Sequence, residues 1–113
     1  MTHTFGWTII ILRVANKEMQ KQPATVRTKF EQLLDVVRRN GFGDIPSKRI
    51  KKLTDDVWEL RVWGDKTTTR ALYLKRDGRR VIIARVFTKK KQKTDDHEIK
   101  LALQRVKEYD HAQ

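Results

Sequence analysis

The sequence predicts a single domain of the mixed α/β (α+β) class, in which helices pack on one mainly antiparallel sheet. Three observations lead to this prediction. The chain has 113 residues with 38% hydrophobic content, enough for one core and too few for two. Two apolar, β-branched runs lie at residues 6–14 and 81–88, and an alternating segment lies between them. Apolar residues recur at helical spacing near residue 30 and again in the last 20 residues, which gives the order strand, helix, helix, three antiparallel strands, helix.

The first half of the chain predicts one strand and two helices. Residues 6–14, GWTIIILRV, form a near-continuous β-branched run that is typical of a strand buried on both faces, so we expect this strand to be central. Asn16 can cap a short helix over 17–21, and Pro23 can begin a second helix. Asn40-Gly41 should end that helix. Its buried face is expected to contain Val26, Phe30, Leu33, Leu34 and Val37.

The middle of the chain predicts two of the three antiparallel strands. After a loop over 41–46, residues 47–53, SKRIKKL, place four cations in a short irregular segment. Residues 57–63 alternate, so that Trp58, Leu60 and Val62 should face the core and Glu59, Arg61 and Trp63 should face solvent. Residues 67–76 form the next strand, and Asp77-Gly78 indicates a two-residue hairpin into the strand over 81–88.

The last helix follows a lysine-rich segment. Asp95 as the cap, with Glu98 three residues later, forms an acidic version of the capping box. We expect the first and last apolar strands to lie side by side, with the helical pair on one face of the sheet. The solvent faces of the middle strands would then form a shallow floor bearing Arg61, bordered by residues 47–53 and 89–93. The buried stripe of the last helix should be Ile99, Leu103, Val106 and Tyr109.

The charge of the chain favours a polyanionic partner. The formal net charge is +12, and residues 75–93 contain nine Lys or Arg residues and one acid. Such a balance is typical of proteins that bind nucleic acid, an acidic protein or an anionic membrane surface. The absence of cysteine excludes disulfides and thiolate metal sites, and the His and Asp spacings predict neither a metal site nor a paired-carboxylate centre. The sequence has no phosphate-cradling glycine loop or nucleophile elbow, so we expect no cofactor. The apolar run at residues 7–12 is too short to cross a bilayer, so we expect a cytoplasmic protein without a membrane partner.

Three stretches carry a resemblance to a known family. They are KKLTDDVWELRVWGD (51–65), TRALYL (69–74) and FTKKKQKTDDHEIKLALQRVKEY (87–109). Together they resemble the phage-derived, HigB-like branch of the RelE/ParE toxin superfamily. The resemblance implies a small RelE-like toxin of a type II toxin–antitoxin pair that cleaves mRNA, often on the ribosome, and is inhibited by a helix-turn-helix antitoxin. Asp95 stands where the family usually has proline, which affects only the helix cap.

RNA cleavage by its own 2′-hydroxyl requires a group that takes the proton, cations that stabilise the phosphorane, and a donor for the departing 5′-oxygen. Clustered Lys and Arg can supply all three without a metal. Arg61 and Arg70 are candidate phosphate clamps, Lys90 and Lys93 candidates for base and positioning, and Tyr73 a candidate for stacking or proton donation. Further contacts to nucleic acid are expected from Lys51, Lys52, Trp63, Arg85, Lys89 and Lys91.

Each assignment has a structural alternative. Arg61 is also a suitable cross-strand partner for Glu59, Arg70 shares its strand parity with Leu72 and can be a semi-buried structural cation, and Tyr73 can serve in packing. Two other functions also remain open. A ParE-like inhibitor of DNA gyrase would leave transcripts intact and produce DNA breaks, and a non-catalytic nucleic-acid-binding module would bind with a steep salt dependence and cleave nothing.

Overall fold

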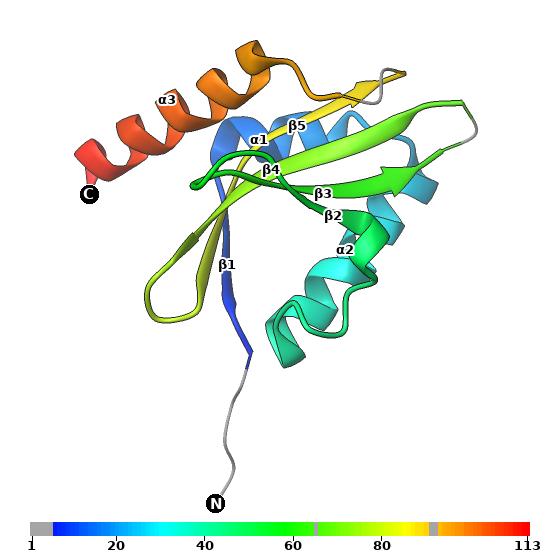
Figure 1. The fold of residues 1–113 in the computed structure, drawn as a ribbon, viewed down its shortest axis with the longest axis horizontal. Coiled ribbons are helices and arrows are strands. Elements are labelled where there is room, and N and C mark those ends of the chain that lie inside the picture. The colour runs from blue at the N-terminus through cyan, green and yellow to red at the C-terminus, as the bar shows by residue number, and fades with distance from the viewer. Residues whose placement is uncertain (1–5, 65, 91–92) are drawn as a thin grey trace, which may run out of the picture.

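A computed structural model describes residues 6–64, 66–90 and 93–113 of the chain. Within these ranges the elements follow the predicted order, with one additional strand in the middle (Figure 1). The helices are α1 (Arg13–Gln20), α2 (Ala24–Asn40) and α3 (Asp96–Ala112), with a short 3-10 helix at Ser47–Arg49. The strands are β1 (Thr8–Ile11), β2 (Ile50–Lys52), β3 (Trp58–Trp63), β4 (Thr68–Arg76) and β5 (Arg80–Lys89).

The five strands form one mixed sheet in the order β1-β5-β4-β3-β2. Strand β1 pairs in parallel with β5, and all other pairs are antiparallel. The predicted mixed α/β class and the pairing of the first and last strands are therefore confirmed. The predicted central position of β1 is wrong, because β1 lies at the sheet edge and contributes four half-buried or exposed residues before α1 begins at Arg13.

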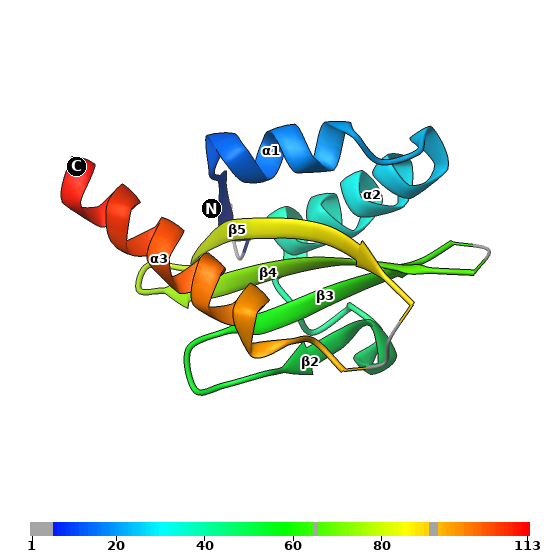
Figure 2. The same cartoon turned by 90° about the horizontal axis from the view of Figure 1, so that it is seen from above.

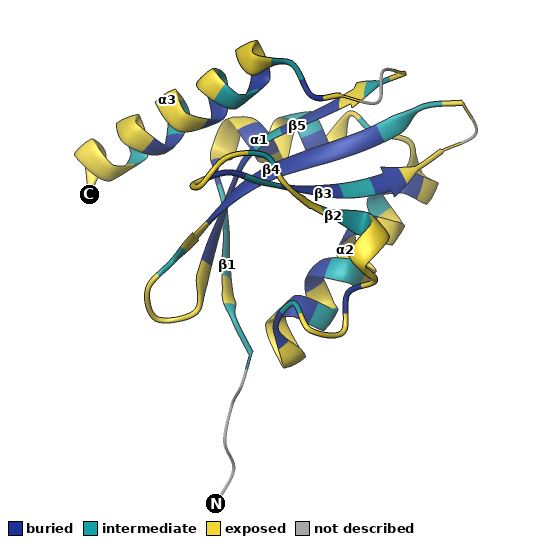
Figure 3. Ribbon diagram, viewed as in Figure 1, coloured by how far each residue is buried: buried dark blue, intermediate teal, exposed yellow. Residues whose placement is uncertain are grey.

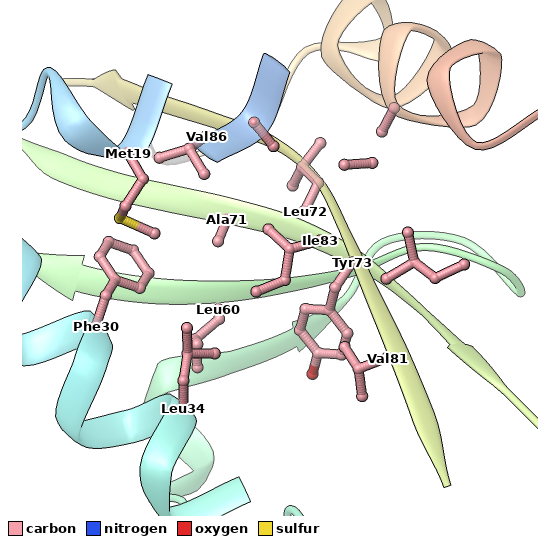
Figure 4. Packing of buried hydrophobic residues seen from close by; sticks show 14 of the residues in the cluster. Met19, Phe30, Leu34, Leu60, Ala71, Leu72, Tyr73, Val81, Ile83 and Val86 are labelled. Atoms are coloured by element: carbon pink, nitrogen blue, oxygen red, sulfur yellow. The ribbon is translucent and has the colours of Figure 1, made fainter. Parts of the chain in front are cut away.

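Helices cover both faces of the sheet (Figure 2). Residues directly opposite on neighbouring strands share a face, so Leu60, Ala71 and Val86 lie together. Phe30 of α2 and Met19 of α1 pack in this cluster (Figure 4). Helix α3 lies against the other face, where Arg76 of β4 binds Asp110 of α3 at 2.7 Å. The central strands are consequently buried on both sides, whereas the outer helix surfaces and the hairpin tip between β4 and β5 are exposed (Figure 3).

Local signals placed the ends of α2 correctly. Pro23 immediately precedes the helix, and Gly41 ends it with φ 78° and a hydrogen bond from its N–H to the carbonyl of Val37 at 2.9 Å. A Cβ at Gly41 would also lie only 2.7 Å from Trp7 Nε1, so both backbone conformation and space require glycine here.

Two turns differ from their prediction. The segment 47–53, expected to be irregular, contains a 3-10 turn and the edge strand β2, whose Ile50 pairs with Leu60. The hairpin after β4 has a three-residue loop over 77–79, in which Gly78 and Arg79 both have positive φ. The short length of β2 explains why no alternating pattern indicated it.

The start of α3 is built from ion pairs instead of the expected capping box. Asp95 is the N-cap residue but makes no side-chain capping hydrogen bond, and its carboxylate pairs with Lys89. The carboxylate of Glu98 binds Arg85 Nε at 2.9 Å and is buried.

The buried face of α3 differs from its prediction at one position. Leu103, predicted to be buried, is exposed, and Ala102 occupies the buried position beside Val106.

Side chains close the part of β5 that extends beyond β1. Glu18 of α1 accepts a hydrogen bond from the N–H of Val86 at 3.1 Å, and Arg105 of α3 donates to the carbonyl of Ala84 at 3.0 Å. These two side chains also bind each other, with Arg105 Nη1 2.7 Å from Glu18 Oε1. The contacts satisfy backbone groups that an open strand edge would present to other chains.

Among the described residues, no helix has the length and apolar composition that crossing a bilayer requires.

The protonation of Glu18 links this edge to pH. Burial acts to raise the pKa of Glu18, but the hydrogen bonds from Arg105 and Val86 and the charges of Arg85 and Arg105 outweigh it and leave the pKa below its ordinary value of 4.5. A carboxylate whose pKa is depressed by folding stabilises the native state above its unfolded pKa, and this stabilisation is lost as pH falls through its folded pKa.

We therefore expect the free energy of unfolding to decrease as pH falls below about 5, and Glu18→Gln to be less stable at pH 7 with a shallower decrease. Urea unfolding between pH 7 and pH 3 tests this, with Asp35→Asn as the control because the Asp35–Arg39 pair is exposed. Equal pH slopes for Glu18→Gln and the unaltered chain would contradict the assignment.

Candidate functional site

The candidate site lies on the α3 face of the sheet, beyond the part that α3 covers. Arg61, Arg70 and Phe87 are directly opposite one another on β3, β4 and β5, and therefore share this face. The next row along the strands contains Trp63 and Lys89, each opposite Thr68. Arg61 and Arg70, which come from different strands, are thus on the same side of the sheet.

A buried carboxylate lies between these two arginines. Glu59 is 0% exposed, with Oε2 at 3.3 Å from Arg61 Nε and Oε1 at 3.1 Å from Arg70 Nη1. The hydroxyl of Thr94 donates to Glu59 Oε1 at 2.7 Å and accepts from Arg70 Nη1 at 2.8 Å. We call Glu59, Arg61, Arg70 and Thr94 the Glu59 network. The prediction that Glu59 faces solvent is wrong, because the chain leading into α3 covers it.

Arg70 and Tyr73 do not fit the catalytic roles expected of them. Arg70 is 2% exposed and bound to Glu59 and Thr94, so its guanidinium is not accessible to an RNA phosphate. This placement fits the alternative interpretation of Arg70 as a structural cation. Tyr73 lies on the α2 side of the sheet and stacks on Phe42 with a centroid distance of 5.1 Å. Burial raises the pKa of Tyr73, which makes its hydroxyl a weaker proton donor as well as an inaccessible one.

Arg85 also does not fit its predicted role as a nucleic-acid contact. Its guanidinium binds Glu98 on one side and Glu18 on the other, and so links α3 to α1. Burial acts to lower the pKa of Arg85, but these two carboxylates outweigh it and raise the pKa above its ordinary value. A guanidinium already neutralised by two acids has little attraction left for a phosphate.

The remaining predicted cations differ in accessibility. The Arg61 side chain is 19% exposed, and Lys89 is partly buried by its ion pair with Asp95. Lys90 and Lys93 are exposed in the segment that leads toward α3. Lys91, another predicted contact, lies outside the described residues. Of the lysines predicted to contact RNA in this segment, Lys90 and Lys93 are therefore the described ones that are most accessible.

The segment before β3 contributes to the same face. Lys51 is opposite Glu59 and exposed, whereas Lys52 is opposite Trp58 and belongs to the other face, with its Nζ 5.7 Å from the Trp58 ring. Lys51 therefore fits the prediction better than Lys52.

Arg49 belongs to this site and was not predicted individually. Its guanidinium carbon lies 4.9 Å from the centroid of the Trp63 ring, and its Nη1 donates to the carbonyl of Arg61 at 3.4 Å. Trp63 is 37% exposed. The cation count of residues 47–53 indicated the region, but only the 3-10 turn at Ser47–Arg49 positions this one side chain.

Arg61, Trp63 and Lys89 share one face by strand register, and Arg49 lies against Trp63. We call this group the cationic surface and include in it Lys51, opposite Glu59, and the exposed Lys90 and Lys93 that come after Lys89 in the chain. Its charged groups come from the 3-10 turn, β2, β3, the end of β5 and the segment leading to α3. Among the described residues, no cluster of three or more His, Asp or Glu side chains has metal-binding geometry. The cationic surface consists of Arg49, Lys51, Arg61, Trp63, Lys89, Lys90 and Lys93.

A family model described as "Phage derived protein Gp49-like (DUF891)" matches residues 6–107. The chain belongs to the Gp49-like family. This match contains the first two stretches that carried the sequence resemblance and most of the third, so the resemblance is confirmed.

Solved structures show that the Gp49-like chain has the fold of RelE toxins. A mutant of the E. coli toxin RelE in the free state is 17% identical, with a TM-score of 0.62 over 89% of this chain and 98% of that one. The M. tuberculosis toxin–antitoxin complex RelBE2 contains a chain that is 18% identical, with a TM-score of 0.53 over 80% of this chain and all of that one. No curated protein matches the sequence. The Gp49-like chain therefore shares the RelE fold, at low sequence identity to both of these proteins.

The Glu59 network predicts unequal effects of its two arginines on stability. Arg70→Ala should lower the free energy of unfolding by about 3 kcal/mol, because it removes the buried cation that compensates a fully buried carboxylate and leaves only the partly exposed Arg61. Arg61→Ala should cost clearly less, since Glu59 retains Arg70 and Thr94. Urea unfolding of both variants at pH 7 measures the difference, and equal losses would contradict the assignment of Arg70 as the structural partner.

Proposed function

We propose that this protein is the toxin of a type II toxin–antitoxin pair and acts as a metal-independent endoribonuclease on mRNA. The observation that carries the proposal is the cationic surface, in which charges from separate parts of the chain lie on one face beside an exposed tryptophan. The net charge of +12 and the RelE-like fold support it. Binding to the ribosome and location in the cytoplasm are part of this proposal.

The expected chemistry begins with attack of a ribose 2′-oxygen on the adjacent phosphorus. The 2′-hydroxyl proton passes to a base, the bond to the 5′-oxygen of the next nucleotide breaks, and that oxygen receives a proton. The products are a 2′,3′-cyclic phosphate and a 5′-hydroxyl. Cations near the phosphate stabilise the charge that develops on its oxygens in the transition state.

Arg61 is the residue that we assign to the phosphate, because a guanidinium remains charged and donates two parallel hydrogen bonds. Lys90 and Lys93 are the candidates for the general base and for positioning, since both are exposed and close to Lys89 in the sequence. Trp63, with Arg49 against its ring, offers a surface on which a nucleobase of the RNA can stack.

An antitoxin partner is the other half of the proposal. The M. tuberculosis relative was solved as a toxin–antitoxin complex, which supports a protein partner for this chain. An acidic segment of a helix-turn-helix antitoxin that lies on the cationic surface would compete directly with RNA. Inhibition would then follow from occlusion of the cations.

Arg61→Ala should reduce RNA cleavage by about a hundredfold or more, because it removes a donor to the transition state. The assay uses purified protein and an end-labelled RNA oligonucleotide in the presence of a chelator. Cleavage products should carry a 2′,3′-cyclic phosphate, and a 2′-deoxy substitution at the cut site should abolish cleavage. Arg39→Ala is the matched control, because it removes the same charge from α2 on the opposite face.

Cleavage that is unaffected by Arg61→Ala would contradict the assigned role. Intact RNA at every protein concentration would reject the ribonuclease. In that case DNA breaks after expression would indicate a gyrase inhibitor, and RNA binding alone would indicate a non-catalytic module.

The double variant Lys90→Ala/Lys93→Ala should weaken RNA binding and reduce its salt dependence. Each phosphate contact that is lost should reduce the slope of log K against log salt concentration by about 0.7 for single-stranded RNA. Fluorescence anisotropy with a non-cleavable 2′-deoxy-containing RNA at several salt concentrations measures this slope. Lys17→Ala/Lys21→Ala is the control, because both of its lysines are exposed and lie in or directly after α1. An unchanged slope in the first variant would exclude phosphate contacts from Lys90 and Lys93.

A further inference from the structure

The two oxygens of Glu59 have different partners. Oε1 binds Arg70 and Thr94, both of which are buried, whereas Oε2 binds Arg61, which reaches the surface. We propose that Glu59 is a positioning residue that holds the Arg61 guanidinium on the cationic surface for the RNA phosphate. This inference rests on the proposed ribonuclease function and extends it to a group that does not itself touch RNA.

Arg70 and Thr94 give Glu59 a fixed orientation. Arg70 Nη1 lies 3.1 Å from Oε1 and also donates to the Thr94 hydroxyl at 2.8 Å, while that hydroxyl donates to Oε1 at 2.7 Å. Two of these contacts hold Oε1 and the third joins their two donors, so the carboxylate cannot rotate without breaking them. The position of Oε2, and with it that of Arg61 Nε, is therefore defined by buried groups.

The contact at Nε suits a guanidinium that must bind a second anion. Glu59 Oε2 accepts from Nε of Arg61 at 3.3 Å, and among the described residues neither Nη group of Arg61 has a hydrogen-bond acceptor. The pair of Nη groups is the edge that binds a phosphate with two parallel hydrogen bonds. Glu59 thus restrains the side chain at its inner end and leaves its outer edge for the ligand.

The same carboxylate connects Arg61 to the lysine segment. Thr94 follows Lys93 directly and is buried, so its hydrogen bond to Glu59 fixes one end of the segment that carries the candidate lysines. A buried ion pair adds little stability compared with apolar side chains of the same volume, because burying the charges costs about as much as their attraction returns. The buried charge of Glu59 therefore needs another explanation than stability. Positioning of Arg61 and of the lysine segment, both of which contact RNA in this proposal, supplies that explanation.

Glu59→Gln tests the inference with minimal change in shape. An amide has one acceptor oxygen, and the buried Arg70 and Thr94 require it, so the amide nitrogen would face Arg61 Nε, donor against donor. We expect the cleavage rate at saturating RNA to fall about a hundredfold through displacement of Arg61, with a smaller change in KM. Glu98→Gln is the matched control, because Glu98 is also buried and paired with an arginine, Arg85, that lies outside the cationic surface.

A double-mutant cycle separates positioning from structural damage. If Glu59 acts through Arg61, Glu59→Gln should reduce cleavage little further in an Arg61→Ala background. An equal further reduction in that background, or an unchanged rate in Glu59→Gln alone, would overturn the inference. If Glu59→Gln does not fold, Glu59→Leu/Arg70→Met replaces it, because removing both buried charges leaves neither uncompensated. That variant should show the same loss of rate and the same dependence on Arg61, and a rate equal to that of the unaltered chain would overturn the inference.

A measurement without RNA distinguishes failure of this inference from failure of the ribonuclease assignment. The Arg61 Nε–H resonance of ¹⁵N-labelled protein should shift strongly in Glu59→Gln and remain in place in Glu98→Gln. If the unaltered chain cleaves no RNA, the ribonuclease proposal fails, and with it the role of Glu59 in catalysis. The shift would still establish that Glu59 positions Arg61, and an Arg61 resonance unchanged in Glu59→Gln would overturn that as well.

Discussion

The candidate site depends on one buried charge, the carboxylate of Glu59. Two arginines on neighbouring strands face each other at β3 and β4, and like charges in this arrangement repel unless an anion lies between them. Glu59 supplies that anion from the adjacent row of the same face. Its burial requires a cover, which the chain at Thr94 provides. The path from β5 into α3 and the exposure of Arg61 are therefore parts of one electrostatic arrangement.

A second ion network has a different consequence because it contains more acid. Arg85 lies between Glu18 and Glu98, and Arg105 joins Glu18, so four charges from α1, β5 and α3 compensate one another. This network closes the free edge of β5 and attaches two helices to it. In the Glu59 network one carboxylate serves two arginines, which leaves an excess positive charge at the surface. The ratio of acid to base thus distinguishes a structural network from one that is ready to bind an anion.

Most of the fold followed from the sequence because its signals are local. The apolar spacing of α2, the glycine that ends it and the alternation of β3 act within a few residues, and each was placed correctly to within a short margin. The errors arose where distant contacts decide. The edge position of β1 depends on which strands pair, and the exposure of Leu103 depends on how α3 lies over β4. Neither property is encoded in hydrophobic periodicity alone.

The site was predicted at the level of region and charge, and the difference between its residues required the structure. Strand pairing puts Arg61 and Arg70 on one face, which parity within each strand does not predict, and parity also does not reveal that a later segment covers Arg70 and leaves part of Arg61 exposed. Arg49 escaped notice because a turn, not a strand, aims it at Trp63. The chain has 26 Lys and Arg residues, so the residue that best identifies the site is the acid that pairs with two of them. Glu59 makes one arginine structural and presents the other, and no count of cations would have shown this division.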